Sequence, residues 1–339
     1  MARDTVRCAL VGLGYWGPNV ARNLADLPDA ELGFLCDRDT DSLQRLARRY
    51  PQARTSTEFA DVLKDGSIDA VFVATPPVSH FELTMAALGS GRHVFVEKPL
   101  TTSSAEAERL IDLAERQRCT LMVDHIFVYS PAVAAIREVI GKGDLGQALY
   151  YDSTRINLGI FQRDVNVVWD LAIHDMAIMD HLFGRTPTAL TAIGRAHLQG
   201  QRENLAYLTF FYADNFIAHV HVNWLAPVKI RRTLIGGTQR MVIYDDLDLE
   251  ERVRVVDKGA AIASSAEAAY DLRVNYRSGD IWAPRIGATE ALHNATAHFI
   301  DCIRKSGRPT TGGSEGLRVV KLLEAADRSL AAGGRPIEL

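Results

Sequence analysis

Residues 7–17 read Arg7-Cys8-Ala9-Leu10-Val11-Gly12-Leu13-Gly14-Tyr15-Trp16-Gly17, and Pro18 follows. An apolar strand that runs into a G-x-G-x-x-G turn and then into a helix is the context in which this glycine spacing has a mechanism. Gly12 allows a tight turn, Gly14 lets backbone N–H groups approach a pyrophosphate, and Gly17 lets the helix pack closely on the strand. The amino end of the helix attracts the phosphates. The stretch therefore predicts a dinucleotide site, with residues 12–17 as cofactor contacts.

The residue that closes the next predicted strand indicates which dinucleotide binds. Asp37 stands about 20 positions beyond Gly17, where a carboxylate binds the adenosine ribose hydroxyls. The carboxylate would repel the 2′-phosphate of NADP, so NAD is the favoured cofactor. Arg38 leaves NADP open, because a guanidinium there accommodates a phosphate. A solvated turn residue is the alternative role for Asp37.

The first 124 residues alternate short β-branched runs with amphipathic segments, which is typical of βαβ units around a parallel sheet. We expect strands at Val6–Val11, Glu31–Cys36, Ala70–Ala74, His93–Val96 and Thr120–Val123. We expect helices at about 18–27, 40–50, 78–90 and 105–118. Ser103 and Glu106 have the spacing of a capping box, which predicts where the last of these helices begins.

After Asp124 the pattern changes to longer alternating strands, which predict a mostly antiparallel sheet. The expected strands are 147–156, 189–196, 206–212, 216–224, 229–235, 239–245 and 251–256. Helices are expected at 131–140, 168–183, 288–306 and 314–332, and residues 258–284 are polar and irregular.

The fold class that follows is α/β with two domains, because 339 residues exceed the size at which one hydrophobic core stops growing. We expect a Rossmann domain with a parallel sheet over residues 1–124. A substrate-binding and oligomerisation α/β domain with a large, open, mostly antiparallel sheet follows over residues 125–339. Its last helices are free to pack back on the first domain.

Composition narrows the class of protein further. Apolar residues make up 47% and charged residues 24% of the chain, as in ordinary globular enzymes. A net charge of −4 lacks the basic footprint that nucleic acid or an anionic membrane requires. No apolar run reaches the roughly 18 residues of a membrane span, and no cleavable signal pattern is present, so we expect a cytoplasmic protein. The four cysteines lack C-x-x-C spacing, and we expect reduced thiols and no metal site.

The stretch Val94-Phe95-Val96-Glu97-Lys98-Pro99-Leu100 predicts a buried strand that carries a lysine at its carboxyl end. Ligands of open α/β folds bind at that end, so we expect Glu97 and Lys98 to contact the cofactor. An ammonium there suits the stabilisation of a developing oxyanion and a share of proton transfer. A solvated surface lysine is the alternative. Thr75-Pro76-Pro77 forms a rigid turn at the same edge, and His80 after it is either a further cofactor contact or a structural histidine.

Asp170 and His174 lie four residues apart on a predicted helix, so their side chains share one face and can meet. Their neighbours are apolar, and ionisable groups among apolar ones are costly unless they are paired or functional. Histidine titrates near neutrality, which suits proton exchange with a hydroxyl. The structural alternative is a helix-capping aspartate beside a hydrogen-bonded core histidine. Asp175 is an alternative structural partner.

Taken together, Gly12–Gly17, Glu97-Lys98-Pro99 and Asp170-x-x-x-His174 resemble the signature positions of the Gfo/Idh/MocA family, named for glucose–fructose oxidoreductase and inositol dehydrogenase. The resemblance covers essentially the whole chain. It implies an NAD(P)-dependent oxidoreductase in which Lys98 bridges substrate and nicotinamide ribose, His174 exchanges the hydroxyl proton and Asp170 positions that pair. It also implies a homodimer or homotetramer formed through the open face of the second sheet.

Two further segments, 155–162 and 276–284, resemble family members that act on nucleotide sugars, often at the 3-position of the sugar. The residues that we expect to contact the substrate are His125, Arg155, Asn157, Arg163, Tyr276, Arg277 and Trp282. The arginines, with Arg285, suit bidentate binding of a pyrophosphate, and Tyr276 or Trp282 suits stacking on a base. Surface arginines or salt bridges between subunits are the alternatives.

The sequence therefore predicts an enzyme that interconverts a secondary hydroxyl and a ketone on a sugar, preferably a nucleotide-linked one. Three alternatives stay open: a dehydrogenase of free cyclitols or aldoses, a glycosidase-type cycle on tightly held NAD without net redox change, and a dinucleotide-sensing protein without catalysis.

Overall fold

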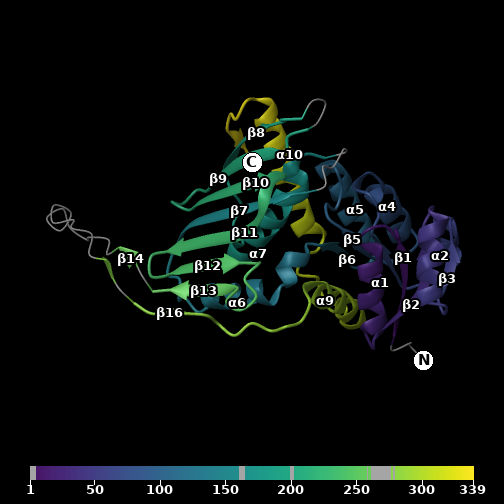
Figure 1. Cartoon of the computed structure of the whole chain (residues 1–339). Coiled ribbons are helices and arrows are strands. Elements are labelled where there is room, and N and C mark those ends of the chain that lie inside the picture. The colour runs from purple at the N-terminus through teal and green to yellow at the C-terminus, as the bar shows by residue number, and fades with distance from the viewer. Residues whose placement is uncertain (1–4, 160–164, 199–201, 258, 261–275, 278) are drawn as a thin grey trace. The chain divides into compact units, whose positions relative to one another are not determined.

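The structure, a computed structural model, describes residues 5–159, 165–198, 202–257, 259–260, 276–277 and 279–339 (Figure 1). The chain divides into two compact units. The first comprises the residues up to Ser130 together with Thr289–Glu324, and the second comprises Pro131–Ala288 and Ala325–Leu339. Each unit is built around its own β-sheet.

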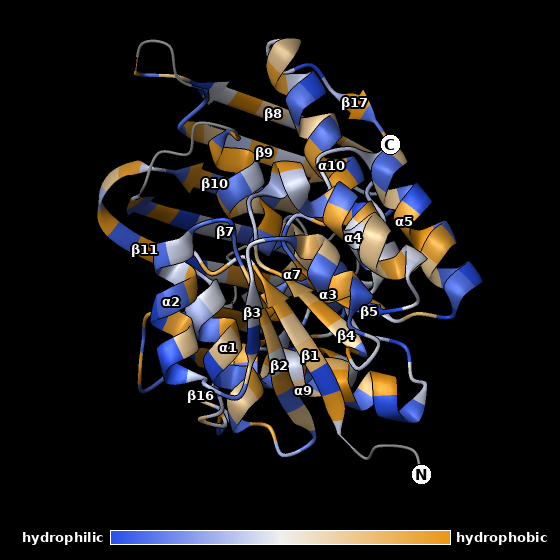
Figure 2. Ribbon diagram, turned by 90° about the vertical axis from the view of Figure 1, so that its right-hand side faces the viewer, coloured by the Kyte–Doolittle hydropathy of each residue, from blue (hydrophilic) through white to orange (hydrophobic). Residues whose placement is uncertain are grey.

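The first unit contains a six-stranded parallel sheet in the order β3-β2-β1-β4-β5-β6. Its strands are β1 (Val6–Val11), β2 (Ala30–Cys36), β3 (Arg54–Ser56), β4 (Ala70–Val73), β5 (His93–Glu97) and β6 (Leu121–Asp124). The central strands are almost entirely buried, which is why they read as continuous apolar runs rather than as alternating ones. Figure 2 shows β1 and β4 mostly in the hydrophobic colour and the helices striped. The Rossmann prediction is confirmed.

Helices pack on this sheet. They are α1 (Gly17–Asp26), α2 (Thr40–Arg49), α3 (Phe59–Lys64), α4 (His80–Gly89), α5 (Ser104–Gln117) and α9 (Ala291–Lys305), with the 3₁₀ turns η1 (Pro77–Ser79) and η2 (Ile126–Tyr129). The helix α9 comes from the end of the chain, and its Phe299 ring lies edge-on to Phe72 and Phe95 with centroids 5.3 and 5.6 Å away. A late segment of the chain thus completes the core of the first unit.

The capping box predicted for α5 is absent. Ser103 is the N-cap residue, but its side chain makes no capping hydrogen bond. The Glu324 carboxylate, from α10 (Gly313–Ala331), instead accepts hydrogen bonds from the Ser104 N–H at 2.8 Å and the Ser104 hydroxyl at 2.7 Å. A carboxylate from a distant helix, rather than the local hydroxyl, satisfies the first turn of α5.

The second unit contains a nine-stranded sheet in the order β16-β13-β12-β11-β7-β10-β9-β8-β17, antiparallel except between β7 and β10. Its strands are β7 (Ala148–Leu158), β8 (Ala189–Arg195), β9 (Leu205–Phe211), β10 (Ile217–Asn223), β11 (Leu225–Gly237), β12 (Met241–Asp245), β13 (Val253–Val256), β16 (Ile281–Trp282) and β17 (Ile337–Glu338). Its helices are α6 (Pro131–Gly141), the π-helical turn η3 (Val168–Ala172) and α7 (Ile173–Phe183). A separate pair is β14 (Gly259–Ala260) with β15 (Tyr276–Arg277). The mostly antiparallel sheet is confirmed.

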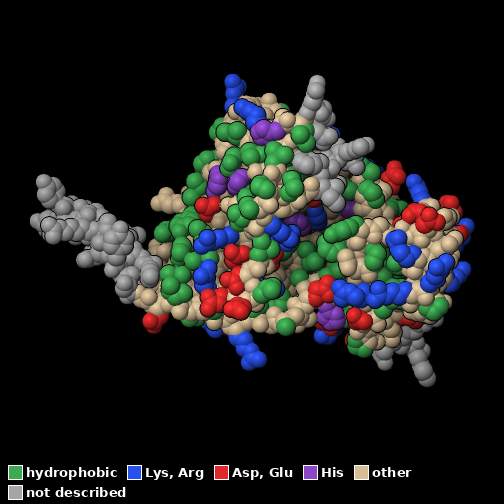
Figure 3. Space-filling model, viewed as in Figure 1, with side chains coloured by type: hydrophobic (Ala, Val, Ile, Leu, Met, Phe, Trp, Pro, Cys, Tyr) green, Lys and Arg blue, Asp and Glu red, His purple; other side chains and the backbone are tan. Residues whose placement is uncertain are grey.

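One face of this sheet carries exposed apolar side chains. Burial alternates along β9 and β10, so Ala218, Val220 and Val222 are buried while their neighbours point outward. The outward large apolar residues are Tyr150, Ile193, Tyr207, Phe211 and Ile217. Figure 3 shows hydrophobic and histidine side chains together over β9 and β10.

The opposite, buried face holds an ion pair that corrects one prediction. Arg155 on β7 donates from Nε to Asp175 Oδ2 at 2.8 Å, and Asp175 also accepts from the Ser153 hydroxyl at 2.7 Å. Arg155 and Asp175 are only 3% and 1% exposed. Removing one partner of such a pair leaves a buried charge uncompensated, at a cost of about 3–5 kcal/mol. Arg155 therefore joins β7 to α7 and does not present its guanidinium to a substrate pyrophosphate, and Asp175 is the structural partner.

Candidate active site

The glycine-rich loop has the geometry that its sequence predicts. Gly12 has φ +94°, and a Cβ there would lie 2.6 Å from the Ala74 carbonyl group. A Cβ on Gly17 would collide with the carbonyl oxygen of Gly12, which keeps α1 against β1. At Gly14, by contrast, a Cβ would meet nothing within 4 Å. The loop is thus closed at its two ends and open in the middle, as a cradle for a pyrophosphate must be.

The Asp37 carboxylate is anchored on this loop. Its Oδ2 accepts from the Leu13 N–H at 2.5 Å and its Oδ1 accepts from the Asp39 N–H at 2.8 Å. Asp37 is half-buried, so the solvated turn residue is the weaker interpretation. Each carboxylate oxygen still has a lone pair to accept a ribose hydroxyl. These residues fit a dinucleotide, with Tyr15, Trp16 and Arg38 exposed beside the cradle.

His80 has a different position from the predicted cofactor contact. Its ring is fully buried, with Nδ1 2.7 Å from the Pro99 carbonyl oxygen and Nε2 2.8 Å from the Thr75 carbonyl oxygen. Burial lowers the pKa of His80, and the two carbonyl acceptors, which only a doubly protonated ring can both satisfy, oppose that shift. His80 therefore joins the turn after β4 to the turn after Lys98, and this is the structural role that the sequence left open.

Lys98 follows β5 at the carboxyl edge of the sheet, the same edge as the glycine-rich loop, and is half-buried. Glu97 and Asp124 are register partners at the ends of β5 and β6, and they are 7% and 2% exposed. Burial raises the pKa of Glu97 to about 7, and burial followed by the charge of Glu97 raises the pKa of Asp124. His125, predicted to contact substrate, is only 2% exposed, and burial followed by Lys98 lowers its pKa to about 3. A cluster of buried ionisable groups thus lies around Lys98.

The helix predicted over 168–183 begins with the π-helical turn η3 and continues as α7. Asp170 lies on the π-helical turn, and His174 lies in the first turn of α7. The Asp170 carboxylate accepts a hydrogen bond from the Trp224 indole at 3.0 Å. Single π-helical turns occur frequently at functional sites. Trp224 was not predicted as a site residue, although its place at the end of a predicted strand is a usable signal.

A hydrogen-bond network holds η3 in place. The side-chain oxygen of Asn166 accepts from the N–H groups of Val168 and Trp169 at 3.1 and 3.2 Å, so Asn166 caps the turn. Asp327 on α10 accepts from the Asn166 amide at 2.8 Å and from the Trp169 indole at 2.7 Å. The sequence signal for Asn166 was its place just before a helix. Nothing local indicates Asp327, because it is 158 residues from Trp169.

Only some of the predicted substrate residues lie near Asp170. Asn157 at the end of β7 is close to Trp224, because a Cβ on Gly159 would lie 2.7 Å from the Asn157 amide nitrogen and 3.3 Å from the Trp224 ring. Trp282 is on β16 at the sheet edge, where the Arg240 guanidinium covers its ring at 5.1 Å, so it does not join Asn157. Tyr276 and Arg277 form β15, paired with β14 apart from the large sheet. Arg163 lies outside the described residues.

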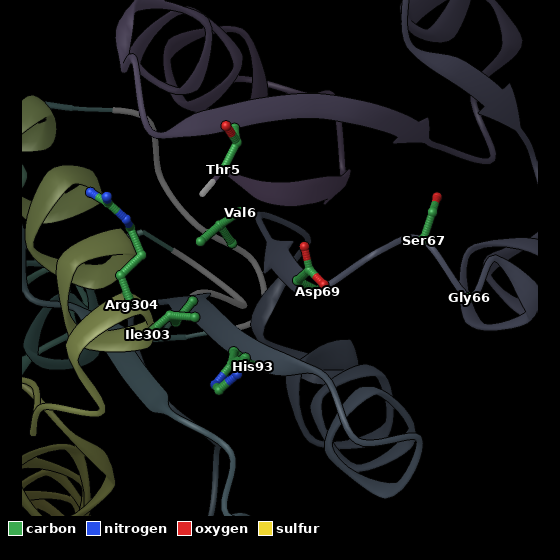
Figure 4. A pocket seen from close by; sticks show the side chains of 8 residues that line it. All are labelled: Thr5, Val6, Gly66, Ser67, Asp69, His93, Ile303 and Arg304. Atoms are coloured by element: carbon green, nitrogen blue, oxygen red, sulfur yellow. The ribbon is translucent and has the colours of Figure 1, made fainter. Parts of the chain in front are cut away.

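A pocket of about 660 Å³ opens in the first unit (Figure 4). It is lined by Thr5, Val6, Gly66, Ser67, Asp69, His93, Ile303 and Arg304. Val6 and His93 are the first residues of β1 and β5, so the pocket lies at the amino ends of the strands. It is therefore at the opposite edge from the glycine-rich loop and is not the cofactor cradle.

Cys8, Cys36 and Cys302 are buried free thiols, and Cys119 is half-buried. Within the described ranges, no three or more His, Cys, Asp or Glu side chains are grouped to hold a metal ion. Among the same residues, no helix combines the length and apolarity needed to cross a membrane.

The fold and the cradle define a dinucleotide-binding protein of the Rossmann class. Residues 6–125 match the oxidoreductase family with an NAD-binding Rossmann fold, and residues 133–243 match the Gfo/Idh/MocA C-terminal domain. The chain is 30% identical to scyllo-inositol 2-dehydrogenase (NAD⁺) of Bacillus subtilis strain 168, over 98% of this chain and 96% of the relative. The chain therefore belongs to the Gfo/Idh/MocA family, and the prediction of an NAD(P)-dependent oxidoreductase is confirmed.

Two other relatives act on different compounds. D-apiose dehydrogenase of Paraburkholderia graminis is 26% identical over 98% of this chain and 89% of the relative. UDP-N-acetylglucosamine 3-dehydrogenase of Acidithiobacillus ferrooxidans is 24% identical over 93% of this chain and 96% of the relative. A solved structure of the latter enzyme superposes with a TM-score of 0.83 at 22% identity, covering 97% of this chain and 98% of that one.

The glycine geometry predicts different effects for two alanine substitutions. We expect Gly14→Ala to lower NAD affinity about 10-fold or more, since a methyl group in the open cradle displaces hydrogen bonds to a charged phosphate. Its melting temperature should not change. Gly17→Ala should destabilise the protein by about 1–3 kcal/mol, because the methyl group overpacks the contact between α1 and the loop. Nicotinamide fluorescence and thermal unfolding measure the two effects, and Gly89→Ala, at another open glycine, is the matched control. Equal behaviour of the two variants would contradict the cradle.

The η3 network predicts that Asp327 positions the turn that carries Asp170. Asp327→Ala leaves the Trp169 indole and the Asn166 amide without their acceptor. We expect turnover to fall about 10-fold or more, because small misplacements of acid/base groups are costly. NAD affinity should be unchanged, since the glycine-rich loop belongs to the other unit. Steady-state kinetics beside NAD titration measure this, with Arg328→Ala on the same helix as control. Wild-type turnover in Asp327→Ala would exclude the positioning role.

Proposed function

We propose that this protein is an NAD-dependent dehydrogenase that interconverts a secondary hydroxyl and a ketone on a sugar or cyclitol. The observation that carries the proposal is the set of groups around Asp170. The buried Trp224 indole donates its single N–H to Asp170 and so orients the carboxylate. The Asn157 amide near Trp224 is a neutral hydrogen-bonding group, which suits a substrate rich in hydroxyls. The similarity to scyllo-inositol 2-dehydrogenase and D-apiose dehydrogenase supports the same substrate class.

NAD is proposed over NADP because of Asp37. The carboxylate is held at the end of β2 by two backbone N–H groups, so it cannot easily turn away from a 2′-phosphate. Arg38 is exposed beside Asp37, and its guanidinium favours NADP.

The proposed chemistry assigns separate roles to three side chains. Bound nicotinamide supplies the redox chemistry of the carbon. The Lys98 ammonium, at the carboxyl edge of the parallel sheet, is proposed to stabilise developing negative charge on the substrate oxygen. His174 is proposed to exchange the hydroxyl proton, since an imidazole titrates near neutral pH. Asp170, which accepts from the Trp224 indole, is proposed to orient the histidine.

These roles predict large effects on turnover without loss of cofactor. Lys98→Ala and His174→Ala should each lower turnover by about 10²-fold or more, the scale of lost acid/base assistance. NAD affinity should stay within a few-fold of wild type. Turnover is followed by absorbance of the reduced nicotinamide, with Lys64→Ala and His181→Ala as controls for each residue type. Normal turnover in both active-site variants would contradict the assignments and would leave the dinucleotide-sensing alternative.

A nucleotide-linked sugar is the second candidate substrate. The similarity to UDP-N-acetylglucosamine 3-dehydrogenase favours it, whereas the burial of Arg155 in its ion pair with Asp175 removes one of the residues predicted to bind it.

One panel of compounds, comprising inositols, free sugars and UDP, distinguishes the substrate classes. We expect inositols and free sugars to produce reduced nicotinamide, and we expect UDP alone not to raise the melting temperature. Protection by UDP would instead favour the nucleotide-sugar enzyme, because a specific ligand stabilises the folded state that binds it. Product release without net reduced nicotinamide would indicate the glycosidase-type cycle.

We also propose that the open face of the nine-stranded sheet forms a homodimer or homotetramer. Tyr207, Phe211 and Ile217 are exposed there at 43%, 39% and 43%, and a contiguous apolar patch of this kind typically marks an interface. The mass of the protein in solution decides between monomer and oligomer.

A further inference from the structure

Two buried carboxyl groups lie at the carboxyl edge of the parallel sheet, where β5 leads into Lys98. Glu97 is the last residue of β5, Asp124 is the last residue of β6, and the two are partners in the parallel register. They are 7% and 2% exposed, and one oxygen of each, Glu97 Oε1 and Asp124 Oδ1, is buried without a hydrogen-bond partner from any other group. As neighbours in register at the ends of adjacent strands, the two carboxyl groups are placed to bond to each other. A carboxylate can only accept a hydrogen bond, so a bond between two carboxyl groups requires that one of them is protonated.

The charges that face this pair are few. Lys98 follows Glu97 in the chain, and its positive charge acts on both carboxyl groups. His125 is neutral, since burial followed by Lys98 lowers its pKa to about 3. Tyr129 is also neutral, since burial raises the pKa of its hydroxyl, which lies 2.9 Å from the Thr311 hydroxyl. Among Lys98, His125 and Tyr129, Lys98 alone carries a positive charge that balances negative charge on the pair.

We propose that Glu97 and Asp124 share a single proton at neutral pH, and that the resulting monoanionic pair positions the ammonium of Lys98. Two ionised carboxylates would repel each other without solvent to separate them. Two protonated carboxyls would leave the ammonium beside a buried polar pair without a counter-charge. With one shared proton the carboxyl pair carries a single negative charge, which balances the single positive charge of Lys98.

The two carboxyl groups hold the proton as a pair. Burial raises the pKa of Glu97 to about 7, and burial followed by the negative charge of Glu97 raises the pKa of Asp124. Lys98 opposes both shifts, so its positive charge favours the singly deprotonated form of Glu97 and Asp124 over the doubly protonated form. Both are positioning residues that act through Lys98, and their effect on turnover rests on the proposed role of Lys98.

Two conservative variants test the contributions of the two carboxyl groups one at a time. Asp124→Asn keeps a donor for Glu97 but cannot titrate, and Glu97→Gln removes the negative charge beside Lys98. The primary readout is the infrared carbonyl band of a protonated carboxyl in the wild-type protein at about pH 7, where free Asp and Glu side chains are ionised. We expect Asp124→Asn to remove this band and the half-buried Asp61→Asn to retain it. A wild-type spectrum without the Asp124-dependent band would overturn the proposal.

Thermal stability gives a second readout that needs no substrate. Because folding raises the pKa values of both carboxyls, the stability they contribute is fully present below the unfolded pKa of about 4 and is lost as pH rises through the folded pKa of Glu97, about 7. The wild-type melting temperature should fall more steeply than that of Asp124→Asn between about pH 5 and pH 8, by about 2–4 °C. Parallel pH profiles of the two proteins would count against the shared proton.

Activity tests the positioning role separately. Glu97→Gln should lower turnover about 10-fold, the scale of one charge-assisted hydrogen bond, with little change in the KM for NAD, and Asp124→Asn should lower it less. If Glu97→Gln does not fold, the band and the pH profile of Asp124→Asn carry the test. A normal Lys98→Ala enzyme would refute the proposed function but leave the infrared band in place. If Lys98→Ala loses activity but the wild-type spectrum has no Asp124-dependent band, the shared proton is refuted and the proposed function is not.

Discussion

Parallel pairing of β1, β4, β5 and β6 is the constraint on which the rest of the first unit depends. Parallel strands present all their carboxyl ends at one edge, so segments far apart in the chain meet there without any specific contact. The glycine-rich loop follows β1, the Thr75 turn follows β4, and Lys98 follows β5. The His80 ring lies within hydrogen-bond distance of the carbonyl oxygens of Thr75 and Pro99, so it joins the turn after β4 to the turn after Lys98. The glycine-rich loop and Lys98 thus share one edge because of backbone hydrogen bonding.

In the second unit, buried polar groups fix the positions of helical segments. The Arg155–Asp175 pair and the Asp327 network each join a helical segment to a neighbouring element. Such groups contribute little net stability, but removing one partner is expensive, and so they define where the helix lies. Their effect is to hold η3 and the start of α7 as one rigid turn. A proposed acid/base pair needs such a turn, because proton transfer depends on position within fractions of an ångström.

The sequence predicted features that depend on local geometry or on burial, and it failed where a partner comes from far along the chain. The glycine-rich loop, the parallel strands and the mostly antiparallel sheet followed from turn chemistry and periodicity, which are local. The strand β3 was missed because three partly exposed residues show no pattern. Ser103 was expected to cap α5, but Glu324 does so from 220 residues away. Arg155 looked like a surface ligand for the same reason, since its partner Asp175 is 20 residues distant and approaches only in the folded sheet.

Whether an arginine is already paired with a carboxylate of the chain also bears on which substrate it can bind. A diphosphate carries charge and needs arginines that are accessible and not already paired, because a guanidinium that already binds a buried carboxylate would have to leave it uncompensated. Arg155 fails this requirement, and Arg240 is engaged with Asp144 and with the Trp282 ring. The Asn157 amide, which lies near Trp224, is instead a neutral hydrogen-bonding group. Within the described part of the second unit, the Arg155 and Arg240 guanidinium groups are therefore committed to carboxylates of this chain, and a diphosphate could bind them only by displacing those carboxylates.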